Sequence, residues 1–347
     1  MQHLEVPFGG ETEPPLPLHA FPPPIISPPL RPPHLQTVVF LHGRGSSARI
    51  FAPPLLSAPI AAAEGPGEKV SSLREALPHA RFVFPTAARS RATVYRRTII
   101  NQWYDGSGDW EETVLGHAKE TVEFVHELLR EEASLVGGAD RVVLGGFSQG
   151  CAAALVCLLL WEGDPLGGFV GMCGMLPMCG DLANIFKEAD QVPSDELGGP
   201  KADIGDNSFG LVLNEDHDPF DRDGSQSSAS PLSQGLNLFR DEMGIEEPTA
   251  GSEAPFRRTP VFLGHGTEDD RVLITHGRAA SRTLRMMGCN VEFRSYDGLS
   301  HWYSEDMLRH ILRFLGGKVS VFGSSGNSDR FQVSDHRKGQ RQDHSTS

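Results

Sequence analysis

The stretch RVVLGGFSQGCAAALVCLLLW, residues Arg141–Trp161, decides the fold. Its apolar start predicts a buried strand at Arg141–Gly145, and its small-residue, apolar end predicts a helix at Gln149–Trp161. Between them lies the G-x-S-x-G pattern GFSQG, the strand–turn–helix setting of a nucleophile elbow. Side chains two residues either side of Ser148 would collide with the strand or the helix, which explains both glycines. We therefore predict that Ser148 is a nucleophile; the alternative is a tight turn with a buried serine.

Apolar strands alternate with helical patterns on both sides of this stretch. Further strands are expected at Thr37–Leu41, Phe82–Pro85, Gly168–Cys173, Pro260–Gly264 and Val291–Tyr296, and further helices at Thr113–Leu135, Thr275–Met287 and Glu305–Leu315. Strands that alternate with helices indicate a mostly parallel sheet with helices on both faces. The predicted fold class is therefore α/β.

Two strand ends downstream of Ser148 carry the partners that a serine nucleophile needs. Pro260–Gly264 is followed by HGTEDD, and Val291–Tyr296 is followed by DGLSH. Ligands gather at the carboxyl ends of parallel strands, and the expected chain order is serine, acid, histidine. We predict that His301 takes the proton from Ser148, the alternative being an ordinary loop histidine. The residues alone leave three candidate acids, Glu268, Asp269 and Asp270.

The loop HGRGSS follows the first long strand and completes the predicted site. Its glycines let the backbone approach a ligand. We predict that the backbone N–H groups of Arg44 and Gln149 form an oxyanion hole. His42 and His265 each stand at a strand end before a glycine, and we interpret both as structural.

Five motifs together resemble the acyl-protein thioesterase/carboxylesterase branch, the phospholipase/carboxylesterase family, of the α/β-hydrolase superfamily. They are FLHGRG (Phe40–Gly45), QWYD (Gln102–Asp105), GGFSQG (Gly145–Gly150), HGTEDDRV (His265–Val272) and GLSH (Gly298–His301). They follow the family's order. The resemblance implies an α/β-hydrolase fold and a cytosolic enzyme without a cofactor. It also implies substrates that are carboxylic esters or acyl thioesters, including S-acylated proteins and lysophospholipids.

The resemblance also assigns residues. It places the catalytic acid three residues after the glycine of HG, which is Asp269, and it places the oxyanion donors at Arg44 and Gln149. Trp103 and Tyr104 match a family segment near the acyl site and are predicted to line it. The alternative, that both are ordinary core aromatics, is equally favoured.

The sequence departs from the family in three ways that matter. Ser46 stands where an acid usually follows HGxG. Cys151 stands where a glycine usually follows GFSQG, and we expect its thiol to be inert filler in the helix–sheet packing. Residues 181–259 replace a short connection and hold 17 acidic and 6 basic residues, −11 of the total −14. We interpret them as a partly disordered acidic insertion, with the hypothesis that it is a lid limiting acyl-chain length. Residues 216–224 faintly resemble a calcium loop, but the ligand spacing is wrong, so no metal site is predicted.

The expected domain organisation has three parts. Residues 1–33 hold eleven of the 26 prolines and are predicted to be a disordered arm. Residues 34–316 form the α/β-hydrolase domain, and residues 317–347, rich in Ser, Asp, Gln and Arg, are predicted to be a disordered tail.

Composition narrows the function classes. With 31 Lys and Arg against 45 Asp and Glu, the chain is a poor ligand for nucleic acid or anionic membranes. No apolar run reaches the 18 or so residues of a spanning helix, so no stable membrane insertion is expected. The N-terminus lacks a signal-peptide pattern, and five cysteines, an odd number, indicate reduced thiols in the cytoplasm.

The prediction is a serine hydrolase whose partner is an ester or thioester substrate. One alternative is a small-molecule carboxylesterase or dienelactone-hydrolase-like enzyme, although the latter more often uses cysteine as nucleophile. The other is a catalytically silent hydrolase fold that serves as a binding protein, which the complete order of serine, acid and histidine argues against.

Overall fold

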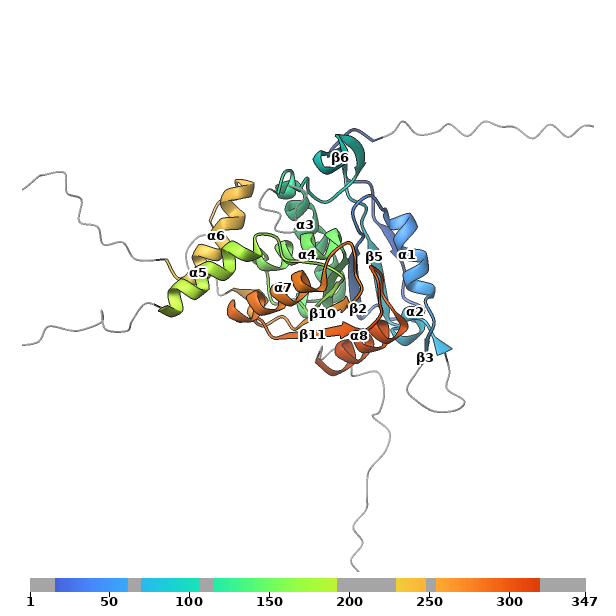
Figure 1. Cartoon of the computed structure of the whole chain (residues 1–347). Coiled ribbons are helices and arrows are strands. Elements are labelled where there is room, and N and C mark those ends of the chain that lie inside the picture. Colours follow the sequence, from blue (N-terminus) through green and yellow to red (C-terminus); the bar gives the residue numbers. More distant parts are fainter. Residues whose placement is uncertain (1–15, 62–69, 107–114, 192–228, 248–253, 319–347) are drawn as a thin grey trace, which may run out of the picture.

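A seven-stranded sheet forms the centre of the computed structural model, which describes residues 16–61, 70–106, 115–191, 229–247 and 254–318 (Figure 1). Its strand order is β1-β5-β2-β8-β9-β10-β11. The strands are β1 (Ile25–Ser27), β2 (Gln36–Leu41), β5 (Ala80–Phe84), β8 (Val142–Phe147), β9 (Gly168–Met172), β10 (Val261–Gly266) and β11 (Val291–Tyr296). Only β1 runs antiparallel to its neighbour. Two short antiparallel pairs lie outside this sheet, β3 (Ile60–Ala61) with β4 (Val70–Ser71) and β6 (Arg89–Ala92) with β7 (Thr98–Asn101).

Helices lie between these strands in the described residues, and α8 follows the last of them. The helices are α1 (Ala48–Ser57), α2 (Leu73–Ala76), α3 (Ala118–Val136), α4 (Gln149–Leu159), α5 (Cys179–Gln191), α6 (Pro231–Met243), α7 (Ile274–Met286) and α8 (Glu305–Lys318). Short 3-10 turns cover Thr93–Tyr95, Ala139–Arg141 and Pro255–Arg257. Every strand and helix expected from the sequence is present, with bounds shifted by a few residues. In the part of the chain that is described, no helix is both long and apolar enough to cross a membrane.

Strand β2 shows why both faces of the sheet are covered. All six of its residues are buried. Val38 and Phe40 point into a core formed with α1, α2 and α8, whereas Val39 and Leu41 point into a core formed with α3, α4 and α7. Successive side chains of a strand alternate between faces, so a strand that is apolar at every position requires helices on both sides. The predicted α/β class, a mostly parallel sheet between two helical layers, is confirmed (Figure 1).

The proline-rich N-terminal segment is partly ordered, which corrects the predicted disordered arm. Ile25–Ser27 form β1 and pair antiparallel with β5. Upstream, the ring of Phe21 stacks on Phe124 of α3, with centroids 4.2 Å apart and an interplanar angle of 8°. The short strand satisfies backbone groups at the edge of β5 that composition alone does not reveal. The first fifteen residues of the predicted arm, and residues 319–347 of the predicted tail, lie outside the described residues.

The predicted acidic insertion also contains order that its weak periodicity concealed. Helix α5 packs against α6 and α7, and Leu182 of α5 joins the core on that face of the sheet. Helix α6 contributes three further core residues, Leu236, Phe239 and Met243. These two helices are ordered because their apolar stripes complete the core. The predicted partial disorder of the insertion stays a prediction. The lid hypothesis and the rejected calcium loop fall mainly on residues 192–228, outside the described residues.

Candidate active site

Ser148 occupies the turn between β8 and α4 in a backbone conformation that few side chains adopt. Its φ is 55° and its ψ is −125°, and its N–H donates to the Met172 carbonyl at 2.9 Å. The glycines on either side are required by close approach. A Cβ at Gly146 would lie 2.3 Å from the Gly150 carbonyl oxygen, and one at Gly150 would lie 2.4 Å from that of His42. Strain of this kind is commonly found at functional sites.

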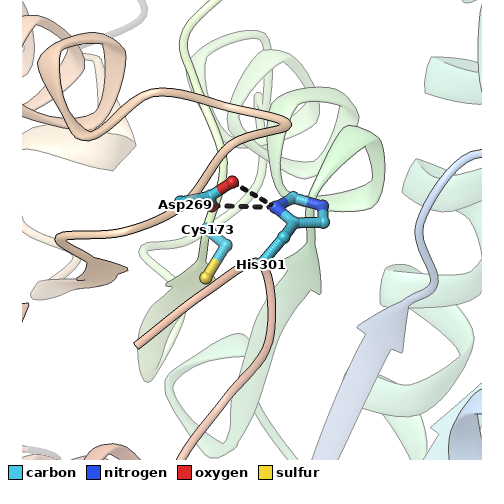
Figure 2. A group of neighbouring side chains, drawn as sticks. All are labelled: Cys173, Asp269 and His301. Atoms are coloured by element: carbon cyan, nitrogen blue, oxygen red, sulfur yellow. Dashed lines mark hydrogen bonds and ion pairs between the residues drawn. The ribbon is translucent and has the colours of Figure 1, made fainter. Parts of the chain in front are cut away.

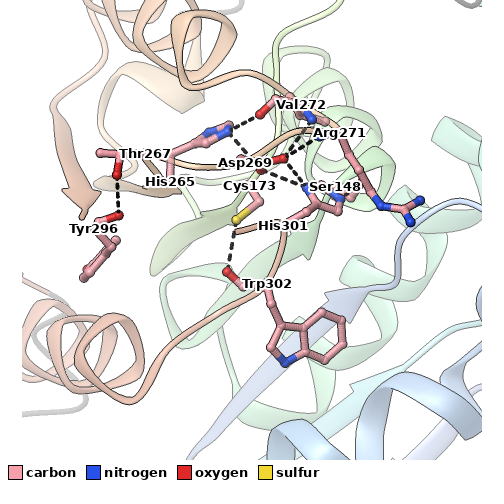
Figure 3. A network of polar contacts seen from close by, with 10 residues as sticks. All are labelled: Ser148, Cys173, His265, Thr267, Asp269, Arg271, Val272, Tyr296, His301 and Trp302. Carbon is pink, nitrogen blue, oxygen red and sulfur yellow. Dashed lines mark hydrogen bonds and ion pairs between the residues drawn. The ribbon is translucent and has the colours of Figure 1, made fainter. Parts of the chain in front are cut away.

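The three residues of the predicted triad lie together in hydrogen-bonding contact (Figure 3). The Nε2 atom of His301 is 2.9 Å from Ser148 Oγ. The Nδ1 atom of the same ring is 2.9 Å from Asp269 Oδ1 and 2.8 Å from Oδ2. The Asp269 side chain is fully buried, whereas the His301 side chain is 11% exposed. The arrangement leaves the serine and the imidazole accessible and keeps the acid out of water.

The loop after β10 surrounds Asp269 with donors. The backbone N–H groups of Arg271 and Val272 donate to Oδ1 at 3.0 and 2.9 Å, and His265 Nε2 lies 3.2 Å from Oδ2. Burial alone raises the pKa of Asp269, but the hydrogen bonds from His265, His301 and Val272 outweigh it and hold this pKa below its usual value. The carboxylate is therefore ionised throughout the physiological range. The competing acids of this loop, Glu268 and Asp270, are exposed.

His265 braces the acid, which the sequence did not reveal. Its ring is buried, and Nε2 also lies 2.7 Å from the Val272 carbonyl oxygen. Its Nε2 thus contacts both the side chain of Asp269 and the backbone of the loop that carries it. The structural role expected for His265 agrees with this position, but the particular contact with Asp269 could not be predicted from a strand-end HG pair.

Cys173 lies next to the acid and the histidine (Figure 2). Its Sγ, one oxygen of Asp269 and one nitrogen of His301 fall within 4.8 Å of one another. Burial raises the pKa of the Cys173 thiol to about 12, so it stays protonated and donates to the Trp302 carbonyl at 3.3 Å. A metal needs the thiolate, and here Asp269 and His301 already bind each other. The cluster fits a hydrogen-bonded triad better than a metal site.

The loop after β2 is held rigidly beside the serine. The Ala87 N–H donates to His42 Nε2 at 3.0 Å, so Nδ1 carries the hydrogen and donates to the Gly43 carbonyl at 2.8 Å. Burial lowers the pKa of His42 to about 4, so the ring is neutral and acts structurally, as expected. Gly45 donates its N–H to the Asn101 carbonyl at 2.8 Å, which ties the loop to β7. Arg44 sits between these anchors, and its role as an oxyanion donor stays a prediction.

The QWYD segment braces the second predicted oxyanion donor. Gln149 is the first residue of α4, where backbone N–H groups have no partner within the helix. Its side-chain Oε1 accepts from the Trp103 N–H at 3.2 Å, and its Nε2 donates to the Tyr104 carbonyl at 2.8 Å. The Trp103 indole donates to the His42 carbonyl at 2.7 Å. These contacts hold both predicted oxyanion segments in place.

The rings of Trp103 and Tyr104 are 1% and 2% exposed and belong to the core. Neither ring faces open solvent, so the observed contacts favour a bracing role; the predicted lining of an acyl site stays a prediction. The indole of Trp302, next to His301, is 41% exposed instead. It contacts Phe147 edge to face at 5.0 Å, and Phe147 contacts the His301 ring at 4.9 Å. The sequence analysis did not predict this contact of Phe147 and Trp302 beside the histidine. The only signal for it was that Trp302 is adjacent to His301 in the sequence.

Cys151 packs as expected. Its side chain is 1% exposed, and burial raises its pKa far above that of an ordinary thiol. The Sγ atom lies so close to Gly171 and Gly174 that a Cβ at either glycine would come within 2.6 Å of it. Cys151 therefore fills the space between α4 and β9 and cannot act as a second nucleophile.

The comparison with known families agrees with this geometry. A model of the phospholipase/carboxylesterase family matches residues 24–199 and 245–318, most of the chain. The chain belongs to the phospholipase/carboxylesterase family. The two matched stretches leave residues 200–244 between them, and the first begins at residue 24, just ahead of β1.

Family relatives and solved structures extend the match. The acyl-protein thioesterase 1 of Yarrowia lipolytica is 24% identical, over 84% of this chain and 96% of the relative. The carboxylesterase SOBER1 of Arabidopsis thaliana is also 24% identical, over 72% of this chain and 81% of the relative. The crystal structures of SOBER1 and of Zea mays acyl-protein thioesterase 2 each superpose with a TM-score of 0.52 at 20% identity. They cover 82% and 85% of this chain and 99% and 98% of their own, so they share its fold.

Proposed function

We propose that this protein is a serine hydrolase that cleaves carboxylic esters or acyl thioesters through an acyl-enzyme. One observation carries the proposal: Ser148 Oγ lies 2.9 Å from His301 Nε2, while His301 Nδ1 lies 2.8 Å from a carboxylate oxygen of Asp269. This is the contact order in which an imidazole acts as general base toward a serine. The family supports the substrate class, because relatives bear the names acyl-protein thioesterase and carboxylesterase.

Acylation uses the contacts just described. Ser148 Oγ forms a bond to the acyl carbon while its proton passes to His301 Nε2. The negative Asp269, held by its donors, stabilises the imidazolium that forms. The N–H groups of Arg44 and Gln149 would hold the oxyanion of the tetrahedral intermediate. His301 then gives its proton to the leaving oxygen or sulfur as the bond to the acyl carbon breaks.

Deacylation repeats the same steps with water. His301 Nε2 takes a proton from water, the oxygen bonds to the acyl carbon, and Ser148 leaves with the returned proton. Every proton in this cycle is carried by Ser148, His301, water or the leaving group, so the proposal includes no cofactor. The proposed location of the protein is the cytoplasm. Its five free cysteines, four of them buried, support this location.

The experiment is hydrolysis of a p-nitrophenyl ester series, short to long chain, by wild type and by Ser148→Ala. A parallel assay measures thiol release from acyl thioesters of the same chain lengths. We expect wild-type activity that falls at least a thousand-fold in the variant, because the triad acts as a unit. Circular dichroism and thermal unfolding of both proteins provide the control for folding. Equal activity in the two proteins would overturn Ser148 as nucleophile.

The two alternatives are outcomes of the same experiment. Hydrolysis confined to short oxygen esters, with no thiol release, would favour a small-molecule carboxylesterase. No hydrolysis by a folded wild-type protein would favour a catalytically silent hydrolase fold. The hydrogen-bonded contact of Ser148, His301 and Asp269 argues against the silent alternative, because a fold retained only for binding has no need of that contact.

A further inference from the structure

Two arginines, Arg44 and Arg271, lie in the loops that approach Ser148 and Asp269, and the proposed mechanism uses their backbone N–H groups but not their side chains. Arg44 follows Gly43, whose backbone comes so close to the serine that a Cβ there would lie 3.4 Å from Ser148 Cβ. The Arg44 side chain is half-buried, with its guanidinium carbon 5.9 Å from the centre of the Tyr104 ring. The loop after β2 therefore holds one cation against Tyr104, one residue away from the backbone that approaches Ser148.

Arg271 supplies the second cation from the opposite loop. Its N–H donates to Asp269 Oδ1 at 3.0 Å, which fixes its backbone against the triad. Its side chain is exposed, and Figure 3 shows it leaving the Asp269 loop on the side of Ser148 and His301. Among the residues that the structure describes, Arg271 makes no salt bridge, whereas Arg81 and Arg309 both pair with acids. An exposed guanidinium without a carboxylate partner is available to a ligand.

The charge around these arginines indicates whether an anion would be bound through long-range attraction or through direct hydrogen bonds. The chain carries −14 overall, and the exposed acids Glu268 and Asp270 precede Arg271 in its loop. The long-range field at this site therefore does not favour anions. A guanidinium can still bind a carboxylate or phosphate through short, paired hydrogen bonds, which depend on contact rather than on net charge.

We propose that Arg271, together with Arg44, binds a negatively charged group of the substrate beside the scissile bond. The preferred substrates are then esters or thioesters that carry a carboxylate or phosphate near the reacting carbonyl. This inference rests on the proposed hydrolase function and deepens it. The charge sits either on the acyl part, as in a half-ester of a dicarboxylic acid, or on the leaving group; the chemistry recognised is the same.

The test compares charged and neutral substrates of matched shape. For the acyl side, the pair is mono-4-nitrophenyl adipate and its methyl ester. For the leaving-group side, the pair is 3-carboxy-4-nitrophenyl butyrate and its methyl ester. The readout is the ratio of kcat/KM for the anionic ester to that for the neutral one, measured in wild type, Arg271→Met, Arg271→Lys and Arg44→Met. Arg313→Met, an exposed arginine on α8, is the matched control.

We expect the wild type to prefer the anion in one of the two pairs, and that pair identifies where the charge sits. Arg271→Met lowers the ratio by about ten-fold or more, the size of a lost charge-assisted hydrogen bond, and Arg271→Lys restores part of it. Arg44→Met lowers the ratio in the same pair. Arg313→Met leaves the ratio unchanged. A merely structural effect of Arg271 lowers both members of a pair equally and leaves the ratio where it was.

The failures are distinguishable. Hydrolysis of all four esters with no anion preference, or a ratio that Arg271→Met does not change, would overturn this inference and leave the proposed function intact. No hydrolysis of any ester by the folded wild-type protein would overturn the proposed function, and this inference with it.

Discussion

The two edges of the central sheet each contain a buried carboxylate, but the partners of the two acids differ. At the carboxyl edge, Asp269 follows β10 and bonds to His301, which in turn reaches Ser148. At the amino edge, Glu132 of α3 accepts from Thr37 Oγ1 at 2.9 Å and lies 3.2 Å from Arg81 Nε. Both acids are 3% exposed.

The two acids differ in whether their partner residue can transfer a proton to a third group. Thr37 and Arg81 are the second residues of two neighbouring strands, so Glu132 joins α3 to the sheet, and neither partner passes a proton to a third group. His301 can take up and release a proton, and a hydroxyl lies on its far side. A buried acid is therefore no sign of catalysis by itself; the acid becomes useful when its partner can pass a proton to a third group.

The largest expected effect comes from replacing the acid at the carboxyl edge. Asp269→Asn keeps the shape but removes the charge and the acceptor that fix the imidazole tautomer. We expect kcat for an ester substrate to fall about a thousand- to ten-thousand-fold, with the protein still folded. Steady-state kinetics and circular dichroism check this. A fall of less than ten-fold would mean that Asp269 and Glu132 play similar, structural roles.

The matched replacement at the amino edge should affect stability instead. Glu132→Gln leaves Arg81 without its buried partner, so we expect the free energy of unfolding to drop by about 1–3 kcal/mol. The range is lower than for a fully buried pair because the Arg81 side chain is 25% exposed. Urea unfolding measures the loss, and kcat should stay within about two-fold of wild type. If Glu132→Gln lost activity without losing stability, the assignment of a structural role to Glu132 and a catalytic role to Asp269 would be wrong.

The smallest expected effect is on the stability of the protein at low pH. Since the folded-state pKa of Asp269 lies below its unfolded value of about 3.9, its ionisation adds stability above that pH. This contribution disappears as pH falls from about 4 toward the folded-state pKa. The unfolding free energy of wild type should therefore decline more steeply than that of Asp269→Asn between about pH 5 and pH 3. Parallel curves from urea unfolding at several pH values would contradict a lowered pKa of Asp269 in the folded state.

Local patterns made the core of the fold, Ser148 and His301 predictable, whereas the choice of Asp269 among three neighbouring acids came from the family resemblance. The run that surrounds Ser148 carries its own strand, turn and helix signals, and the strand-end positions of Asp269 and His301 follow from sheet topology. The bracing contacts of His265 and Gln149 were not predictable, because they join loops far apart in sequence through particular side-chain rotamers. The same holds for α6, whose apolar residues gain meaning only beside Leu182 of α5.

The short strand β1 has a consequence for the behaviour of the protein in solution. It covers the outer edge of β5, and prolines stand on both sides of it, at Pro22–Pro24 and Pro28–Pro29. Proline lacks the N–H that a further strand would need, so the edge that β1 presents is a poor template for another molecule. A truncation at residue 34 would remove β1 and uncover the β5 edge. Such a protein should self-associate through its sheet, whereas one that begins at residue 16 should stay dispersed.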